Sequence, residues 1–209
     1  MDVYQAIAAR RTVREFDGRP IDPAVLERIL SAGLRAPSND HMRSWEFVLV
    51  SDPSVRAQLI APIPKTFSRK QVEKILENWG LIDEVQRQMY FDGIPKQYAM
   101  LQTAPCLLLP YFRQKPPLLR PKSLSDLNAF ASIWCCIENI LIAAAAEGIC
   151  GVTRIPFEKE QALARQVLEV PEDYTLPCFL ALGYPAADVK HPKQYEYAAE
   201  QKIHMNRWQ

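Results

Sequence analysis

The sequence predicts one domain of mixed α/β or α+β architecture, and three observations support this. The 209 residues suffice for one domain with a well-buried core, or for two small ones at most. Three or four short apolar runs typical of strands are separated by helical patterns instead of being joined as hairpins. The chain contains neither a G-x-G-x-x-G loop nor a Walker loop, so a dinucleotide or triphosphate would have to be bound by other means. We therefore expect a single domain over residues 1–209.

The first two elements are expected to be helices. Residues 2–10 place apolar side chains at helical spacing. Asp22 followed by Pro23 is typical of an N-cap and a first helical position, and the helix that they start should run to about residue 35. Pro37 marks its end.

A strand and a long excursion follow. Residues 45–50 are aromatic and β-branched enough to form a buried strand, and residues 51–53 close it and start another short helix. Residues 62–98 mix Pro and Gly with two polar helical runs, 69–79 and 82–90. This segment is either an ordinary helical excursion over the core or a lid that covers a substrate.

The longest predicted helix lies between two core strands. Residues 104–109 should form a second strand, and residues 113–122 a basic, Pro-rich surface loop. Ser125 is a plausible N-cap for a long helix that runs to Glu147 and ends at Gly148.

The last third of the chain is expected to contain one more core strand and an extension. Residues 150–155 should form a short strand or extended loop, residues 158–168 a helix, and residues 178–184 a third core strand. Residues 185–209 are polar with scattered apolar anchors. We expect this C-terminal extension to pack along a partner subunit or back over its own.

Composition narrows the possible functions. The chain has 25 Lys and Arg against 24 Asp and Glu, which argues against a nucleic-acid binder that relies on a general positive field. Five cysteines form no C-x-x-C pair, so neither a disulfide framework nor a metal site is indicated, and the expected location is the cytoplasm. The N-terminus lacks the pattern of a secretory signal. The apolar run 130–146 is short for a bilayer span and carries Glu138, so we interpret it as a buried core helix and expect no membrane segment.

A cationic cluster at the end of the first helix is the main candidate for function. Arg10, Arg11, Thr12 and Arg14 place three guanidiniums and a hydroxyl within five residues. Guanidinium groups pair with phosphate oxygens geometrically as well as electrically, so the cluster could bind an anion. The alternative is a solvated basic helix end, which is common. A second stretch one helix later, residues 36–47, favours the anion site.

These two stretches resemble the nitroreductase family of FMN-dependent oxidoreductases. That family has Arg-Arg/His-Ser/Thr-x-Arg/Lys-x-Phe after a short N-terminal helix, and residues 10–16 match it. One helix later it has Ala-Pro-Ser-x-x-Asn-x-Gln-Pro-Trp-x-Phe, of which Ala-Pro-Ser at 36–38, Trp45 and Phe47 are present in register. The apolar helix with Glu-Asn at 138–139 and Leu-Gly-Tyr-Pro at 182–185 also resemble family elements.

The resemblance implies an α+β, three-layer fold with a mixed central sheet flanked by helices. It also implies an intertwined homodimer, with one FMN at each of two sites built by both subunits. The phosphate and ribityl chain would be held by Arg10, Arg11, Thr12 and Arg14 of one subunit, and the isoalloxazine would be bordered by Pro37, Ser38, Asn39 and His41 of the other. Backbone groups of residues 153–156, which include Thr153, Arg154 and Ile155, would lie near its reactive edge. A basic residue after the last strand, Lys193, would complete the phosphate site.

The chain departs from the family pattern at three neighbouring positions. His41 stands where the family usually has Asn, Arg43 where it has Gln, and Ser44 where it has Pro. One interpretation is that His41 is another hydrogen-bond donor to the same flavin oxygens. The other is that His41 or Arg43 alters flavin electronics or binds an anionic substrate, since a cation near the pyrimidine end favours the reduced flavin.

The function that follows from the resemblance is an FMN-dependent oxidoreductase. NADH or NADPH would reduce the flavin, and a nitroaromatic, quinone or similar small acceptor would then oxidise it in the same pocket by a ping-pong mechanism, with no catalytic side chain required. Two alternatives stay open: a specialised enzyme of the same fold, performing reductive dehalogenation or flavin-fragmenting chemistry, and a non-catalytic flavin- or nucleotide-binding sensor. The sequence does not choose the acceptor, the nicotinamide or one- against two-electron reduction.

Overall fold

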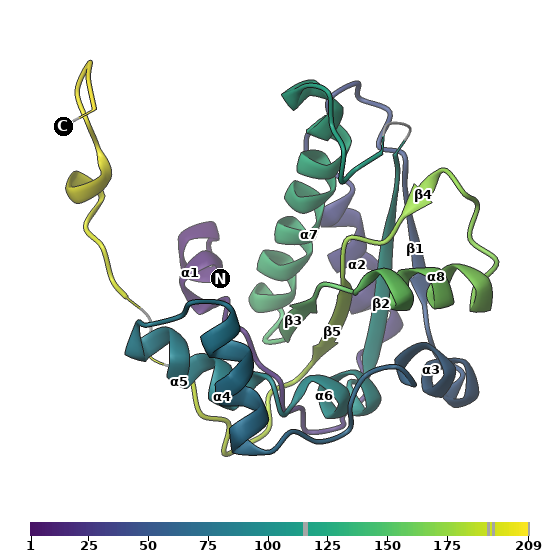
Figure 1. Cartoon of the computed structure of the whole chain (residues 1–209). Coiled ribbons are helices and arrows are strands. Elements are labelled where there is room, and N and C mark those ends of the chain that lie inside the picture. Colours follow the sequence, from purple (N-terminus) through teal and green to yellow (C-terminus); the bar gives the residue numbers. More distant parts are fainter. Residues whose placement is uncertain (115–116, 192, 194, 209) are drawn as a thin grey trace.

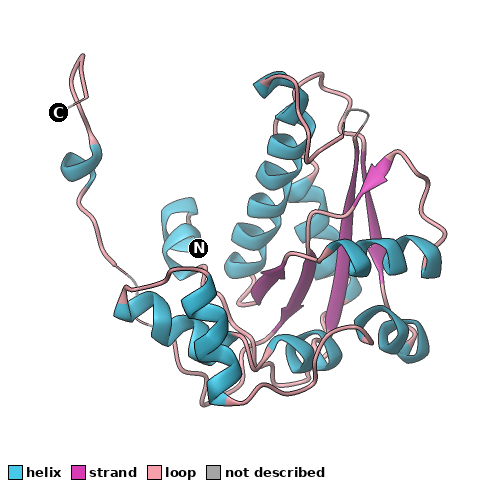
Figure 2. Cartoon of the chain, in the orientation of Figure 1, coloured by secondary structure: helices cyan, strands magenta, loops and turns pink. Residues whose placement is uncertain are grey.

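The fold is a three-layer α+β arrangement. A computed structural model describes residues 1–114, 117–191, 193 and 195–208. A central sheet is covered by α2 and α7 on one face and by α3, α6 and α8 on the other, while α4 and α5 lie at one end (Figures 1 and 2). The elements are α1 (Val3–Ala9), α2 (Pro23–Gly33), β1 (Trp45–Leu49), α3 (Pro53–Ile60), α4 (Arg69–Asn78), α5 (Glu84–Gly93), α6 (Gln97–Thr103), β2 (Cys106–Arg113), α7 (Asn128–Ala146), β3 (Cys150–Arg154), α8 (Glu158–Val167), β4 (Tyr174–Thr175) and β5 (Phe179–Gly183), with short 3-10 helices η1 (Leu124–Leu127) and η2 (Ala199–Lys202).

The sheet has the order β1-β2-β5-β3, and β4 pairs with the end of β2. All these strand pairs are antiparallel. The segment after α1 adds a parallel bridge between Thr12 and Gly151 and an antiparallel one between Phe16 and Pro185. With these bridges the sheet is mixed, as the family resemblance implies.

Two apolar cores lie on opposite faces of β2. Because successive side chains of a strand point to opposite faces, Cys106 and Leu108 face α2 and α7, while Leu107 and Leu109 face α3, α6 and α8. All four side chains are buried. A strand that is apolar on both faces is typical of the centre of a layered fold, and β2 is such a strand.

The long helix α7 forms one wall of the first core. Measured with η1, residues 124–146 are long and apolar enough to cross a membrane by length and composition, a longer stretch than the run counted from the sequence. In the structure α7 packs against α2 and the sheet. The central helix of a globular fold meets the same criteria, so the packing supports our interpretation as a core helix.

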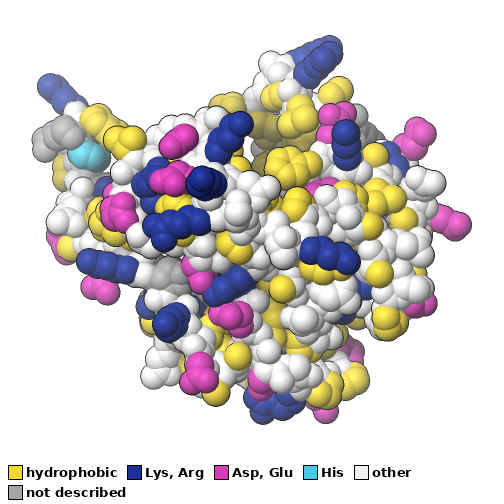
Figure 3. Space-filling view, turned by 60° about the horizontal axis from the view of Figure 1, so that its bottom comes forward, with side chains coloured by type: hydrophobic (Ala, Val, Ile, Leu, Met, Phe, Trp, Pro, Cys, Tyr) yellow, Lys and Arg dark blue, Asp and Glu magenta, His cyan; other side chains and the backbone are white. Residues whose placement is uncertain are grey.

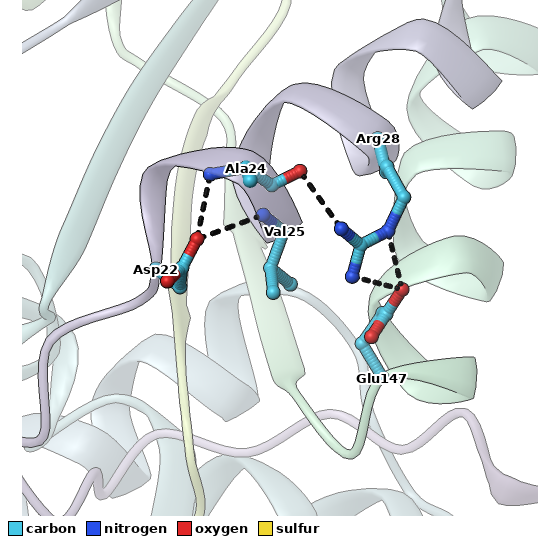
Figure 4. A network of polar contacts seen from close by, with 5 residues as sticks. All are labelled: Asp22, Ala24, Val25, Arg28 and Glu147. Atoms are coloured by element: carbon cyan, nitrogen blue, oxygen red, sulfur yellow. Dashed lines mark hydrogen bonds and ion pairs between the residues drawn. The ribbon is translucent and has the colours of Figure 1, made fainter.

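The start of α2 shows how local sequence positions this layer (Figure 4). The Asp22 carboxylate accepts hydrogen bonds from the backbone N–H groups of Ala24 at 2.7 Å and Val25 at 3.4 Å, as the N-cap prediction requires. One turn later, the Arg28 guanidinium donates to Glu147 at the end of α7, with both bonds at 3.1 Å. The cap starts the helix, and the ion pair attaches α2 to the end of α7.

Several sequence expectations are corrected by tertiary context. The strand β1 is an edge strand with Glu46 and Leu49 exposed, so it is only partly buried. Ser125 lies inside η1 and is not the N-cap of α7, which begins at Asn128. Neither α6 nor β4 was expected, because a seven-residue helix and a two-residue strand leave no clear periodicity.

The second strand is longer than expected and contains a proline. It continues through Pro110 to Arg113 because β5 pairs with residues 106–108 and β4 with 112–113. Pro110 falls between these two pairings, where its missing N–H leaves no ladder bond unmade on that side.

The excursion 62–98 folds as a helical hairpin with a small core of its own. Val72, Leu76 and Ile94 are buried within it, surrounded by aromatic side chains. The C-terminal extension, by contrast, projects away from the body (Figure 1). It contacts α5 through the Tyr195 hydroxyl, which donates to the Asp83 carboxylate at 2.6 Å. That this extension packs along a partner subunit or back over its own therefore stays a prediction.

The cysteines serve as packing residues in the described part of the chain. Cys106, Cys136 and Cys178 are buried, Cys150 is partly buried and Cys135 is exposed. Burial raises the pKa of Cys106 and of Cys136 to about 12 and raises the pKa of Cys178 further. Thiols with raised pKa values are poor nucleophiles at neutral pH, so no redox or nucleophilic role is assigned to these three cysteines.

Candidate functional site

The arginine segment is held against β3, the last strand of the sheet. Thr12 forms a parallel bridge with Gly151 of β3, and the N–H of Val13 donates to the Gly151 carbonyl at 3.3 Å. Val13 is buried, so this pairing also anchors the segment by packing. The structure thus brings residues 10–14 beside the strand that carries Thr153 and Arg154, which are about 140 residues away in the sequence.

The three arginines have different environments. Arg10 caps the C-terminus of α1, and its Nε lies 3.6 Å from the Glu138 carboxylate of α7. Arg11 is exposed. Arg14 is partly buried, and no hydrogen bond or ion pair with a described residue satisfies its guanidinium. The three arginines of this segment therefore differ in burial, and Arg14 is the one that is partly buried without a bonded partner among the described residues.

Gly93, at the end of α5, allows the excursion to approach Arg14 closely. A Cβ at this glycine would lie 3.0 Å from both Cζ and Nη2 of Arg14. Burial lowers the pKa of Arg14, and the charges of Asp92 and Tyr90 only partly oppose this. The Asp92 carboxylate bonds to Lys96 at 2.5 Å instead of to Arg14.

The turn after β3 is anchored by a buried ion pair. Arg154 donates to both carboxylate oxygens of Glu160 at 2.6 and 2.8 Å, and its Nε donates to Gln97 of α6 at 3.0 Å. Glu160 also accepts the backbone N–H of Phe157 at 2.9 Å. The hydrogen bonds of the Arg154 side chain are thus made within the protein. A ligand at this turn would meet its backbone groups and the exposed Ile155 side chain.

The Pro-Ser loop is tightly folded and conformationally strained. The Ser38 hydroxyl accepts the N–H of Arg43 at 3.2 Å, and the Ser38 carbonyl accepts the N–H of His41, also at 3.2 Å. His41 and Arg43 have positive φ angles of 59° and 46°, which side-chain-bearing residues rarely adopt. Such strain, of about 1–3 kcal/mol per residue, persists where surrounding contacts impose it and is common at functional sites.

The loop is tied to the start of α7. Its Asn39 N–H donates to the Ser132 hydroxyl at 3.2 Å, and the Asn128 side-chain amide donates to the Asn39 side-chain oxygen at 3.0 Å. A cavity of about 410 Å³ lies here, and its walls come from the loop, the end of β2 and the start of α7. Pro37 and His41 are exposed at its margin. Eleven of its fifteen lining residues have polar or charged side chains, so the cavity can offer hydrogen bonds to a ligand.

Within one chain, the two halves of the predicted site point in different directions. Arg10 contacts Glu138 of α7, whereas Asn39 contacts Ser132. Those two α7 positions are six residues apart, which corresponds to about 9 Å along the axis and about 120° around it. The arginine segment and the Pro-Ser loop therefore approach different faces of α7.

Lys193 lies in the extension and is exposed. Its proposed role in completing a phosphate site stays a prediction.

Three residues that hold the predicted site segments in place were not identified from the sequence. They are Lys96, Glu160 and Ser132. The spacing of Asp92 and Lys96, four residues apart on one helical path, was the one usable signal. The partners of Glu160 and Ser132 follow only from the packing of elements distant in sequence.

The donor set of the arginine segment fits a phosphate group. A guanidinium that is partly removed from water without a partner is unfavourable, and a dianionic phosphate would supply the missing acceptors. The Thr12 hydroxyl and the guanidiniums of Arg10 and Arg11 belong to the same short segment as Arg14. Among the described residues, by contrast, no group of three His, Cys, Asp or Glu side chains is placed to hold a metal ion.

Comparison with known proteins agrees with this geometry. The model of the family described as "Nitroreductase family" matches residues 7–184. An iodotyrosine deiodinase of Nematostella vectensis is 26% identical over 197 residues, covering 91% of this chain and 70% of the relative. A putative NADH dehydrogenase/NAD(P)H nitroreductase of Methanothermobacter thermautotrophicus is 25% identical over 212 residues, covering 100% of this chain and 88% of the relative. A crystal structure of oxidised iodotyrosine deiodinase bound to FMN and 3-iodo-L-tyrosine superposes with a TM-score of 0.74 at 19% identity, covering 99% of this chain and 100% of that one. The chain belongs to the nitroreductase family.

Proposed function

We propose that this protein is an FMN-dependent oxidoreductase that takes reducing equivalents from NADH or NADPH and passes them to a small aromatic acceptor. The observation that carries the proposal is the Arg14 guanidinium, which is partly buried, belongs to the same short segment as Arg10, Arg11 and Thr12, and has no anionic partner bonded to it among the described residues. When bound, FMN would accept a hydride from the nicotinamide and then reduce a nitroaromatic or quinone in the same pocket.

The protein's own residues bind and orient in this proposal. Arg10, Arg11, Thr12 and Arg14 hold the phosphate and the ribityl chain by charge and hydrogen bonds. Backbone groups of residues 153–155 border the reactive edge, and the buried Arg154–Glu160 pair keeps that turn rigid. No acid, base or nucleophile is assigned, because positioning and stacking suffice for hydride transfer.

A homodimer would complete the site. Because the arginine segment and the Pro-Ser loop approach different faces of α7, a flavin held by the arginine segment of one copy would be bordered by Ser38, Asn39 and His41 of a second copy. The helix α1 supports this, since it buries only Ala6 and leaves its apolar side chains 49–81% exposed. Exposed apolar surface of this kind is typical of a subunit interface.

Reductive dehalogenation is the second candidate. It is favoured by the deiodinase relatives at 26–28% identity and by the folded hairpin 62–98, which packs on the arginine segment at Gly93. In this alternative the hairpin covers a halogenated phenol, and its exposed face selects the substrate.

Flavin titration tests the cofactor, and a panel of acceptors tests the reaction. The purified protein is expected to become yellow with FMN, to be reduced by NADH or NADPH, and to turn over nitroaromatics and quinones. If neither NADH nor NADPH reduces bound FMN, and the dithionite-reduced protein dehalogenates a halotyrosine, the second candidate is favoured. Absence of FMN binding would contradict both.

Removing the three guanidiniums tests the anchor. The variant with Arg10, Arg11 and Arg14 replaced by Gln should lose at least about tenfold in FMN affinity, because several charge-assisted hydrogen bonds to phosphate disappear. Riboflavin, which keeps the ribityl chain but lacks the phosphate, serves as the comparison ligand and should lose much less affinity than FMN. A variant that binds FMN as the parent does would show that the phosphate lies elsewhere.

A further inference from the structure

Two carboxylates lie close to the arginine that the proposed phosphate site most depends on. Glu15 is its sequence neighbour, and Asp92 belongs to α5, whose end packs on the Arg14 guanidinium at Gly93. Of the charges that act on Arg14, that of Asp92 is the largest. Either carboxylate could occupy the guanidinium in place of a phosphate, because Arg–carboxylate pairs form readily with the same fork geometry.

Neither carboxylate is paired with Arg14 in the structure. The ammonium of Lys96 bonds to both of them, at 2.7 Å to Glu15 and 2.5 Å to Asp92. The Lys96 side chain is 27% exposed, so the contact is only partly screened by solvent. Although burial acts to lower the pKa of Lys96, its hydrogen bonds to Asp92 and Glu15 outweigh burial and raise it, so the ammonium is charged at neutral pH.

We propose that Lys96 is a positioning residue that sequesters Asp92 and Glu15 and thereby leaves Arg14 free to bind the phosphate of FMN. This inference rests on the proposed function and adds to it a residue outside the arginine segment. Lys96 does not need to touch the cofactor; it acts by occupying the two carboxylates that would compete for Arg14.

The location of Lys96 gives this arrangement a second consequence. It lies in the link between α5 and α6, directly before Gln97, which accepts a hydrogen bond from Arg154. The end of the hairpin therefore touches both the phosphate segment and the turn after β3. Basic and acidic side chains intermingle over the face of the molecule shown in Figure 3. The pairing of charges within such a surface determines which cationic side chains can bind an anionic ligand.

The Lys96→Met variant tests the proposal, with FMN and riboflavin as probes. Once Lys96 is removed, Asp92 should pair with Arg14, and the FMN dissociation constant should rise about fivefold, the size of one partly exposed ion pair. The riboflavin dissociation constant should not change, because riboflavin has no phosphate. Lys70→Met in α4 is the matched control, since it removes the same charge from an exposed position of the hairpin.

A second substitution separates sequestration from a direct contact. In the double variant Lys96→Met/Asp92→Asn no carboxylate at position 92 can occupy Arg14, so most of the FMN affinity should return. If the double variant binds FMN as weakly as Lys96→Met, or if Lys96→Met binds FMN like the parent, the proposal is wrong. Equal losses for FMN and riboflavin would also overturn it, since they would indicate a general structural role.

One variant keeps the test independent of folding effects at position 96. Asp92→Asn alone leaves Lys96 in place, and it should bind FMN at least as tightly as the parent; weaker binding would contradict the proposal. A parent protein that binds neither FMN nor riboflavin would overturn the proposed function as well, whereas normal parent binding with an unaffected Lys96→Met overturns only this inference.

Discussion

Charge pairing inside the molecule distinguishes residues that look alike in the sequence. Arg14 and Arg154 are both arginines near the proposed flavin site, yet Arg154 is fully satisfied by Glu160 and Gln97 while Arg14 has no bonded partner among the described residues. A satisfied, buried guanidinium rigidifies a turn, and an unsatisfied one offers its hydrogen bonds to a ligand. At the scale of the residue, the difference between structure and binding is therefore a difference in partners.

The buried pair gives a prediction about stability. Glu160→Gln removes a charge from a side chain that is 4% exposed and leaves the Arg154 guanidinium buried without a counterion. The free energy of unfolding should fall by about 3 kcal/mol, measured by urea denaturation. Asp173→Asn, which breaks the exposed ion pair with Arg113, is the control and should have a much smaller effect. Equal losses in the two variants would show that burial does not determine the outcome.

At the scale of elements, close approach between α2 and α7 decides how the first core packs. Gly33, near the end of α2, is buried, and its missing side chain lets α7 come within contact distance. This requirement cannot be recognised in a single sequence, where a glycine near a helix end is equally typical of a C-cap. The same element carries the Arg28–Glu147 ion pair, so two separate contacts orient it against α7, while the Asp22 cap starts the helix.

Gly33→Ala tests the packing of these two helices. The added Cβ would lie 2.6 Å from Cγ1 of Ile140 and 3.2 Å from Sγ of Cys136, so overpacking should outweigh the better helix propensity of alanine. We expect the free energy of unfolding to fall by about 1–2 kcal/mol. Ser31→Ala, exposed on the same helix, should not destabilise the protein. Adding Ile140→Val to Gly33→Ala should recover part of the loss; a further loss would contradict overpacking.

At the scale of the whole molecule, one chain leaves surfaces that the fold does not cover. Apolar side chains of α1 are exposed, and the extension projects from the body (Figure 1). The tyrosine and tryptophan residues of the extension are more than half exposed. The proposed site is also divided, since its halves approach different faces of α7. A second copy of the chain would bury this surface and unite the site in one arrangement.

Disruption of the α1 surface tests the proposed assembly. Ile7→Lys places a charge in the exposed apolar face of α1, where the side chain is 49% exposed. Sedimentation equilibrium should show a shift from dimer to monomer, and FMN affinity should fall with it, because the second half of the site is lost. Ala9→Lys, about 200° around the same helix, should leave both unchanged. A parent protein that is monomeric and still binds FMN tightly would reject the two-subunit site.

Local chemistry made much of this protein predictable from its sequence. Caps such as Asp22, helix ends such as Gly148 and the apolar runs of the core strands depend on neighbouring residues, and the structure places these elements as expected. The arginine and Pro-Ser motifs were recognisable because their residue types are closely spaced in the chain. The edge position of β1, the helix α6 and the start of α7 were not predictable in this way.

The sequence by itself determined most of the elements, the α+β class and the family, because these depend on short-range patterns that survive without three-dimensional context. Tertiary structure decided which charges pair. Lys96 and Glu15 are 81 residues apart in the chain, and Arg10 meets Glu138 only because α1 packs on α7. Such contacts follow from how elements pack, since the electrostatic attraction that selects a partner acts over a few ångströms of space and is indifferent to sequence separation.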